Sequence, residues 1–300
     1  MAIFVAGIRQ SEFMIKTLQL GNHLVAFLDV LGQRERFRAL HHPTTPEDRA
    51  EVAEVLRQTA GFVLELRNVF DTQFIAFETG LTNLKKLTEN PVRPKFMGFS
   101  DSFVTSVPIR TDDGHLALMV TIVSALSAAA GVMSVSLASG HPLRGGIDVG
   151  LAVEIGPQEI YGTALEKAYL LESEEAGYPR IVIGEELWHF LSSAHAHFQV
   201  QETPESKAIT AIIGKAKRLI AIDKDGKRVL DYLGPAIVEN YPGLIEKIKE
   251  LELKPIYEFV LAEQERINKR NDPKLIARYQ AFRYYIESRL PLWNFDVVKT

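Results

Sequence analysis

The sequence predicts an α+β fold with a ferredoxin-like βαββαβ core and a C-terminal helical extension. Three observations predict it: a buried strand pattern near the N-terminus, a long helical pattern after it, and a later hairpin–helix–hairpin order. Strands and helices in this order can return to one sheet and form such a core. We expect the core to span residues 1–200. Residues 201–300 are expected to form a hairpin plus helices that pack on it.

The first strand is predicted from the run HLVAFLDVL at residues 23–31, which is almost continuously apolar and rich in β-formers. The run ends at Asp29 and is soon followed by Gly32, which favours a turn. Asp29 is therefore expected near the end of a buried strand.

A long helix follows, because Pro46 suits the first helical position and apolar residues then recur at helical spacing to about Leu87. It is expected as one helix or as two joined near Gly61. The segment KFMGFSDSFVTSVPI has two apolar runs separated by SDS, which predicts a β-hairpin with Asp101 at its tip.

Small apolar residues at 114–139 predict a tightly packed core helix, and LRGGIDVGLAVEI at 143–155 predicts a strand that bends into a second one at Gly150. The residues IYG at 160–162 then lead into the helix TALEKAYLLESEEA, and RIVIG is expected to form another short strand. After residue 200, RLIAIDKDGKRVLDYL predicts a hairpin with a DG turn, and two amphipathic helices are expected at 241–290.

Composition limits the functional classes. The 300 residues are 46% hydrophobic and 24% charged, which is typical of a folded soluble protein. A net charge of −4 without a basic tail argues against binding nucleic acid through its phosphates. The lack of cysteine leaves only oxygen and imidazole ligands for a metal. We expect a cytoplasmic protein that binds no membrane, because the apolar segments are short or interrupted.

Asp29 and Asp101 are the candidate metal ligands. Both are predicted at strand ends, and the first strand and the hairpin can be neighbours in one sheet. Two carboxylates of this kind suit magnesium or manganese at a phosphate ester, where two ions can clamp the attacking and leaving oxygens. The alternative is purely local, because aspartates also stabilise turns and hairpin tips. Spacing alone favours neither interpretation.

The ordered segments FLDVLG, FSDSFV, LRGGIDVG and IYGTALEKAYLLE resemble the core of the class III nucleotide cyclases, and most closely the bacterial Pycsar pyrimidine cyclases. The resemblance covers roughly residues 23–190. It implies that Asp29 and Asp101 bind two Mg²⁺ or Mn²⁺ ions. It also implies that the turn after Asp29 meets the triphosphate, with Arg34 or Arg36 as a charge partner.

The resemblance also bears on base choice. Purine-specific members carry a lysine and an aspartate where this chain has Met97 and Glu159. Glu159 can accept a hydrogen bond from N3–H of uracil or from the amino group of cytosine. Tyr161 and Tyr169 can wall in a base, although both patterns also suit interior packing. UTP is the first expected substrate and CTP the second.

The chain departs from the family in the later helix, where typical members have an asparagine and, four residues on, an arginine that stabilises the transition state. Glu166 and Leu170 occupy these positions. Leucine supplies no charge to the phosphorus, so either another arginine substitutes or catalysis rests more on the metals. Arg144 and Arg180 are the candidate catalytic residues. Either can instead be an ordinary strand-end residue.

The resemblance implies 3′-hydroxyl attack on the α-phosphorus, release of pyrophosphate and a 3′,5′-cyclic second messenger used in antiphage defence. Class III sites form between subunits, so a head-to-tail homodimer with shared sites is expected. Three alternatives remain open: a purine cyclase, a dinucleotide-forming nucleotidyl transferase, and a catalytically degenerate nucleotide-binding module.

Overall fold

A computed structural model describes residues 20–32, 40, 42–82, 92–99, 101–110, 114–155, 159–241 and 243–295. Its first part alternates strands and helices: β1 (Leu20–Val30), α3 (Pro46–Thr82), β2 (Lys95–Phe99), β3 (Ser102–Ile109), α4 (His115–Ala138), β4 (Leu143–Glu154), β5 (Ile160–Gly162) and α5 (Thr163–Leu170). The predicted α+β class is confirmed.

The second part is mainly helical. It consists of the π-helix η1 (Leu171–Glu175), β6 (Ile181–Ile183), α6 (Glu185–Gln199), α7 (Pro204–Arg218), β7 (Ile220–Ile222), β8 (Arg228–Leu230), α8 (Pro235–Asn240), α9 (Ile245–Ile248), the π-helix η2 (Lys249–Leu253), α10 (Lys254–Arg270), α11 (Pro273–Arg289) and the 3₁₀ turn η3 (Leu290–Trp293). The hairpin with a DG turn is confirmed, and Gly226 of that turn has a φ of 81°. The helices α6 and α7 are additions to the predicted elements.

One mixed sheet organises the chain in the order β2-β3-β1-β4-β6-β8-β7, with β5 paired to β4. The pairs β2–β3, β3–β1 and β1–β4 are antiparallel, whereas β4–β6 is parallel. The hairpin predicted around Asp101 is confirmed, because β2 and β3 pair in antiparallel register from Lys95 opposite Ser106 to Phe99 opposite Ser102. Strand β1 therefore lies between the hairpin and β4.

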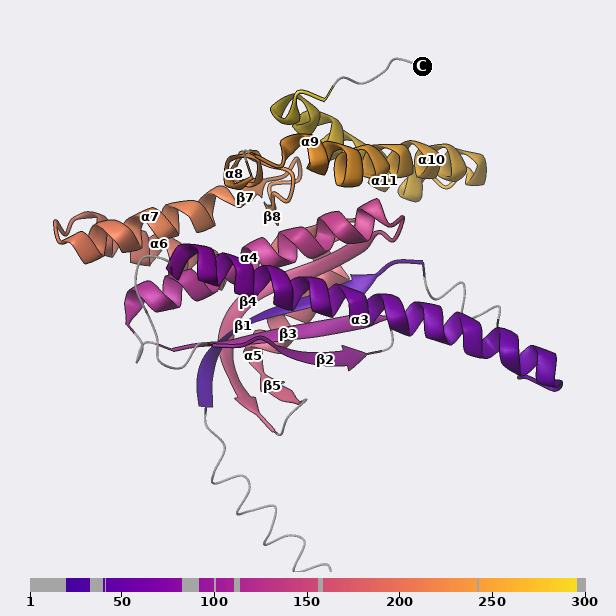
Figure 1. Ribbon diagram of the computed structural model, residues 1–300, viewed down its shortest axis with the longest axis horizontal. Helices are drawn as coiled ribbons and strands as arrows, with labels where there is room; N and C mark the ends of the chain where they lie inside the picture. The colour runs from indigo at the N-terminus through magenta and orange to yellow at the C-terminus, as the bar shows by residue number, and fades with distance from the viewer. Residues whose placement is uncertain are drawn as a thin grey trace, which may run out of the picture.

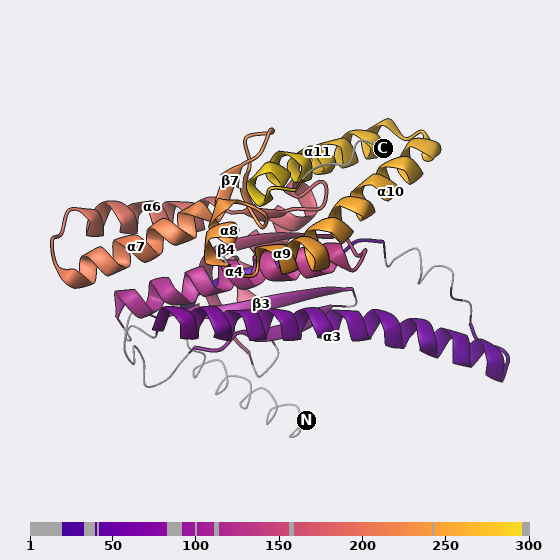
Figure 2. The same ribbon diagram turned by 45° about the horizontal axis from the view of Figure 1, so that its top comes forward.

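The helices α3 and α4 lie side by side over one face of the sheet (Figures 1 and 2). Alternate residues of β1 explain this packing, because Leu24, Ala26 and Leu28 belong to the large core cluster on that face. The long helix runs unbroken through Gly61, and its N-terminal part projects past the sheet (Figure 1).

The opposite face carries a second, smaller hydrophobic cluster, to which Val25 and Val104 contribute from the strands and Ala164 and Ala168 from α5. Helix α5 crosses β4 closely. A Cβ on Gly146 would stand 2.3 Å from the Ala168 carbonyl oxygen, so only glycine permits this approach.

The expected division into two strands at Gly150 is wrong, because β4 continues through it as one strand from Leu143 to Glu154. Gly150 instead allows a close contact between β4 and α5. A Cβ at Gly150 would stand 3.0 Å from the backbone nitrogen of Ala164, at the start of α5. It therefore marks a close helix–strand contact.

Helix α4 is the core of the fold. Within the described part of the chain it alone is long and apolar enough to cross a membrane, but 89% of its most apolar window is buried inside the protein. The sheet and α3 cover one side of it, and α7, η2 and α10 cover the other. This is the environment of a core helix in a soluble domain, as predicted.

Candidate functional site

The two candidate metal ligands lie at the same end of neighbouring strands. Asp29 stands opposite Ser102 in the β1–β3 pairing, directly beside the turn that carries Asp101. The backbone N–H of Val30 donates to the carbonyl oxygen of Asp101 at 3.1 Å, which fixes the turn against β1. Asp29 is 8% exposed and Asp101 is half-buried. The first strand and the hairpin are neighbours, as the sequence predicts.

Arg144 is the cation of this cluster. It stands opposite Asp29 in the β1–β4 pairing, and its Nη2 lies 3.5 Å from Oδ2 of Asp29. Its Nε forms an ion pair with Glu172, whose side chain is only 4% exposed. One guanidinium therefore joins two carboxylates that come from β1 and η1.

Glu172 is a residue of this cluster that sequence reasoning does not single out. It follows Ala164 and Ala168 at four-residue spacing, and both alanines are buried under the sheet. That spacing predicts a buried position for Glu172 as well, and a buried carboxylate requires a cation nearby. The four-residue spacing is thus the sequence signal from which a buried Glu172 can be predicted.

Arg180 has a different environment from Arg144. Its guanidinium pairs with Asp223 at 2.6 Å and with Asp225 at 2.7 Å, both in the β7–β8 turn. It also donates to the carbonyl oxygens of Glu175 and Ala176. Burial by itself lowers the pKa of Arg180, but its hydrogen bonds to Asp225 and Asp223 outweigh burial and raise the pKa above its ordinary value. Its hydrogen-bonding groups are therefore occupied by a buried structural network.

Glu159 and Tyr161 lie far from Asp29 within one chain. Both belong to the β4–β5 hairpin, where Glu154 pairs with Ile160, whereas Asp29 pairs with Arg144 near the start of β4. Arg144 and Glu154 are ten positions apart, which corresponds to about 33 Å measured along the strand at a rise of about 3.3 Å per residue. Glu159 and Tyr161 are exposed, the latter by 72%.

Met97 and Arg34 complete the predicted set. Met97 lies opposite Val104 in the hairpin and packs against the second hydrophobic cluster, as a strand residue facing a core would. Arg34, like Arg36, lies outside the described residues.

The carboxylates of Asp29 and Asp101 are ligands of the kind that hard divalent cations prefer, provided that a substrate fills the remaining coordination positions. In the described part of the chain, no group of three or more His, Asp or Glu side chains is arranged to hold a metal by itself. Two carboxylates at one strand end nonetheless match magnesium, which takes one or two protein carboxylates and fills its remaining positions with water and phosphate oxygens.

Comparison with known proteins gives matches only among solved structures. No protein-family model matches the sequence, and no curated protein is significantly similar to it. A class III adenylyl cyclase-like ATP-binding protein from Pseudomonas aeruginosa is 16% identical over 67% of this chain, with a TM-score of 0.37. Two structures of a bacterial light-regulated adenylyl cyclase are 13% and 14% identical over 63% and 66% of this chain, with TM-scores of 0.32 and 0.29.

This chain spans 41% and 56% of the first two matched chains and 99% of the third. At these TM-scores and identities, any function has to be inferred from the residues of this chain.

Proposed function

We propose that this protein is a class III nucleotide cyclase that converts UTP, or CTP, to the 3′,5′-cyclic monophosphate and pyrophosphate. One observation carries the proposal: Asp29 and Asp101 lie at the same end of two adjacent antiparallel strands, joined there by the hydrogen bond from Val30. Carboxylates in this position suit metal-assisted displacement at phosphorus.

The strand order supports a ferredoxin-like core. The order β2-β3-β1-β4 with antiparallel neighbours, built from a strand, a helix, a hairpin, a helix and a strand, is what a βαββαβ unit produces. We place the catalytic core within residues 1–200 and treat residues 201–300 as an extension packed on it.

In this mechanism, Asp29 and Asp101 hold the metal ions. Magnesium or manganese, when bound, lowers the pKa of the ribose 3′-hydroxyl and neutralises charge on the triphosphate. Arg144 balances the carboxylates and keeps the Asp29 side chain oriented, while Glu172 fixes the other side of the same guanidinium. Arg144 is the better candidate for a cation near phosphate, because the guanidinium of Arg180 is already held by two aspartates.

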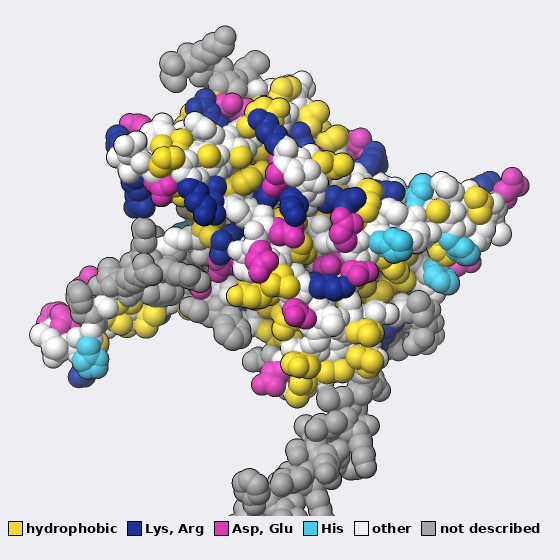
Figure 3. Space-filling model, turned by 180° about the vertical axis from the view of Figure 1, so that it is seen from behind, with side chains coloured by type: hydrophobic (Ala, Val, Ile, Leu, Met, Phe, Trp, Pro, Cys, Tyr) yellow, Lys and Arg dark blue, Asp and Glu magenta, His cyan; other side chains and the backbone are white. Residues whose placement is uncertain are grey.

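The separation of Glu159 from Asp29 supports a head-to-tail homodimer. One chain does not bring a base contact at the β4–β5 hairpin to metal ligands at the other end of β4, about 33 Å away along the strand. A second copy can supply it. Hydrophobic side chains gather on the face that α5 covers (Figure 3), where Tyr169 is 49% and Leu170 is 40% exposed. Such a surface suits contact with another subunit.

Base preference follows from the same arrangement. Glu159 of the partner subunit would accept a hydrogen bond from the pyrimidine, beside Met97 and the aromatic side chain of Tyr161. The resemblance to the Pycsar cyclases extends the proposal to synthesis of a second messenger in the cytoplasm during antiphage defence.

Product identification tests the proposal. The protein is incubated with all four ribonucleoside triphosphates and Mn²⁺, and the products are separated and identified by mass spectrometry. A 3′,5′-cyclic pyrimidine monophosphate is the expected product. A linear or dinucleotide product would instead support a nucleotidyl transferase, and nucleotide binding without pyrophosphate release would support a degenerate binding module.

A further inference from the structure

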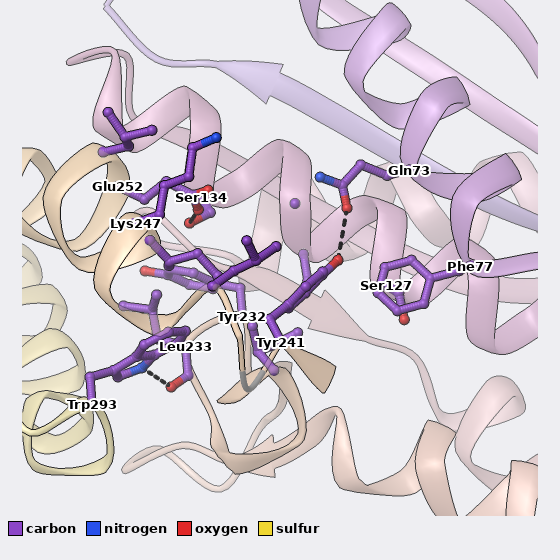
Figure 4. A pocket seen from close by; sticks show the side chains of 16 residues that line it. Gln73, Phe77, Ser127, Ser134, Tyr232, Leu233, Tyr241, Lys247, Glu252 and Trp293 are labelled. Carbon is purple, nitrogen blue, oxygen red and sulfur yellow. Dashed lines mark hydrogen bonds between the residues drawn. The ribbon is translucent and has the colours of Figure 1, made fainter. Parts of the chain in front are cut away.

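A partly open cavity of about 230 Å³ lies between the core helices and the C-terminal region (Figure 4). Helices α3 and α4 form one side, and residues from α8, η2 and η3 form the other. The cavity shares no lining residue with the cluster around Asp29. It is therefore separate from the proposed catalytic site.

Small residues on α4 create this space. Ser127, Gly131 and Ser134 follow one another at helical spacing and all line the cavity. A Cβ at Gly131 would stand 2.8 Å from Cδ of Gln73, so a larger residue there would have to displace the end of that side chain. Larger side chains at these positions would fill the cavity.

Aromatic side chains form much of its wall. Phe77 and Tyr241 meet edge to face with ring centroids 6.0 Å apart. Trp293 is 1% exposed and its Nε1 donates to the carbonyl oxygen of Leu233 at 2.9 Å. Tyr232 is 2% exposed, and its hydroxyl has no hydrogen-bond partner in the described part of the chain. Aromatic rings therefore form part of the wall, and a hydrogen bond holds Trp293 in place.

One acidic side chain faces this aromatic surrounding. The carboxylate of Glu252, on η2, accepts a hydrogen bond from Oγ of Ser134 at 2.6 Å (Figure 4). No Lys, Arg or His of the described residues lies within ion-pair distance of it, although the exposed Lys247 is at the rim. Burial raises the pKa of Glu252 above its ordinary value. A partly buried carboxylate without a cation is destabilised by its loss of hydration, and a bound cation would reduce that cost.

We propose that this cavity binds a small organic ammonium ion, of about the size of choline, by pairing it with Glu252 beside the aromatic side chains of the wall. Aromatic faces attract ammonium groups, and the attraction grows when the group is desolvated. The volume is below the roughly 300 Å³ at which pockets for drug-sized ligands begin, so the ligand must be small.

Isothermal titration calorimetry of the full chain with choline chloride tests the proposal. Choline should bind at least about tenfold more tightly than 3,3-dimethylbutan-1-ol, which has the same shape without the charge. n-Butylammonium serves as a second cationic probe. Equal affinity for choline and the neutral alcohol would overturn the proposal, as would the lack of binding by both cations.

Substitutions of two glutamates on η2 distinguish binding at this site from a general effect of negative charge. Glu252→Gln keeps the shape and the acceptor for Ser134 but removes the charge, and should weaken choline binding by about tenfold or more. Glu250→Gln changes an exposed glutamate that pairs with Lys254 at 3.8 Å, and should leave binding unchanged. Unaltered affinity in Glu252→Gln, in a protein with an unchanged melting profile, would refute the role of this carboxylate. Nucleotide turnover is not part of these measurements, so failure of the cyclase proposal leaves this one intact.

Discussion

Replacing Asp29 by asparagine separates its catalytic role from its structural one. The substitution keeps the size of the side chain but removes the charge that faces Arg144 at 3.5 Å. A Coulomb attraction at that distance is worth about 5 kcal/mol at an effective dielectric constant of about 20, but desolvation offsets most of it. Arg144 also keeps its second partner, Glu172. The free energy of unfolding should therefore fall by only about 1 kcal/mol.

Activity should respond far more strongly than stability. If Asp29 holds a metal ion, turnover should fall at least about 100-fold, equivalent to about 2.7 kcal/mol of barrier. Turnover is measured as pyrophosphate release with Mn²⁺, and the free energy of unfolding is measured by urea denaturation. Asp71→Asn on α3 is a matched control and should leave both unchanged. Near-native turnover in the Asp29 variant would mean that the two-metal proposal names the wrong ligand.

Three further predictions follow from other parts of the chain. Arg180→Ala should lower the free energy of unfolding by about 3 kcal/mol because it removes a buried guanidinium and leaves the mostly buried side chain of Asp223 without its cation. Arg218→Ala, in an exposed pair, should cost less than about 1 kcal/mol, and urea unfolding compares the two variants. Glu159→Gln should change the nucleotide preference in competition assays and leave stability unaltered; an unchanged preference would remove this residue from the site. Because burial raises the pKa of Glu252, its stabilising contribution is complete below its ordinary pKa of 4.5 and is lost as pH rises through the folded value. The free energy of unfolding of Glu252→Gln should thus equal that of the wild type near pH 4.5 and exceed it at pH 8. If the two proteins lost or gained stability in parallel over this pH range, the prediction would be wrong.

The elements that sequence patterns predict are those whose signals are local. The apolar run before Asp29 predicts β1, and two apolar runs around Asp101 predict the hairpin, because strand and turn preferences act over a few residues. Helix α7 carries a comparable signal, with buried Ile209, Ile212 and Ile213 at helical spacing. Its weak overall hydrophobicity makes that signal easy to overlook, since most of its stability comes from packing against α4 and α6.

In the candidate site, local sequence patterns predict the two aspartates but not the partners of the arginines. Both aspartates can be predicted because each follows a recognisable strand. The pairing of Arg144 with Glu172, and of Arg180 with Asp223, depends on contacts across 28 and 43 positions, respectively. An arginine in a sequence gives no sign of which carboxylate it meets. The assignment of Arg180 to a structural network therefore needed the folded chain.

Helix α4 imposes a constraint on how this protein is made. Its covering elements α7 and α10 begin at Pro204 and Lys254, well after α4 ends at Ala138. At a synthesis rate of about 5–20 residues per second, the ribosome needs on the order of ten seconds to produce them. During that interval the nascent chain carries a segment apolar enough to be taken for a membrane anchor. Expression of fragments that stop before α10 should therefore be limited by aggregation or by capture of this helix, whatever the catalytic competence of the core.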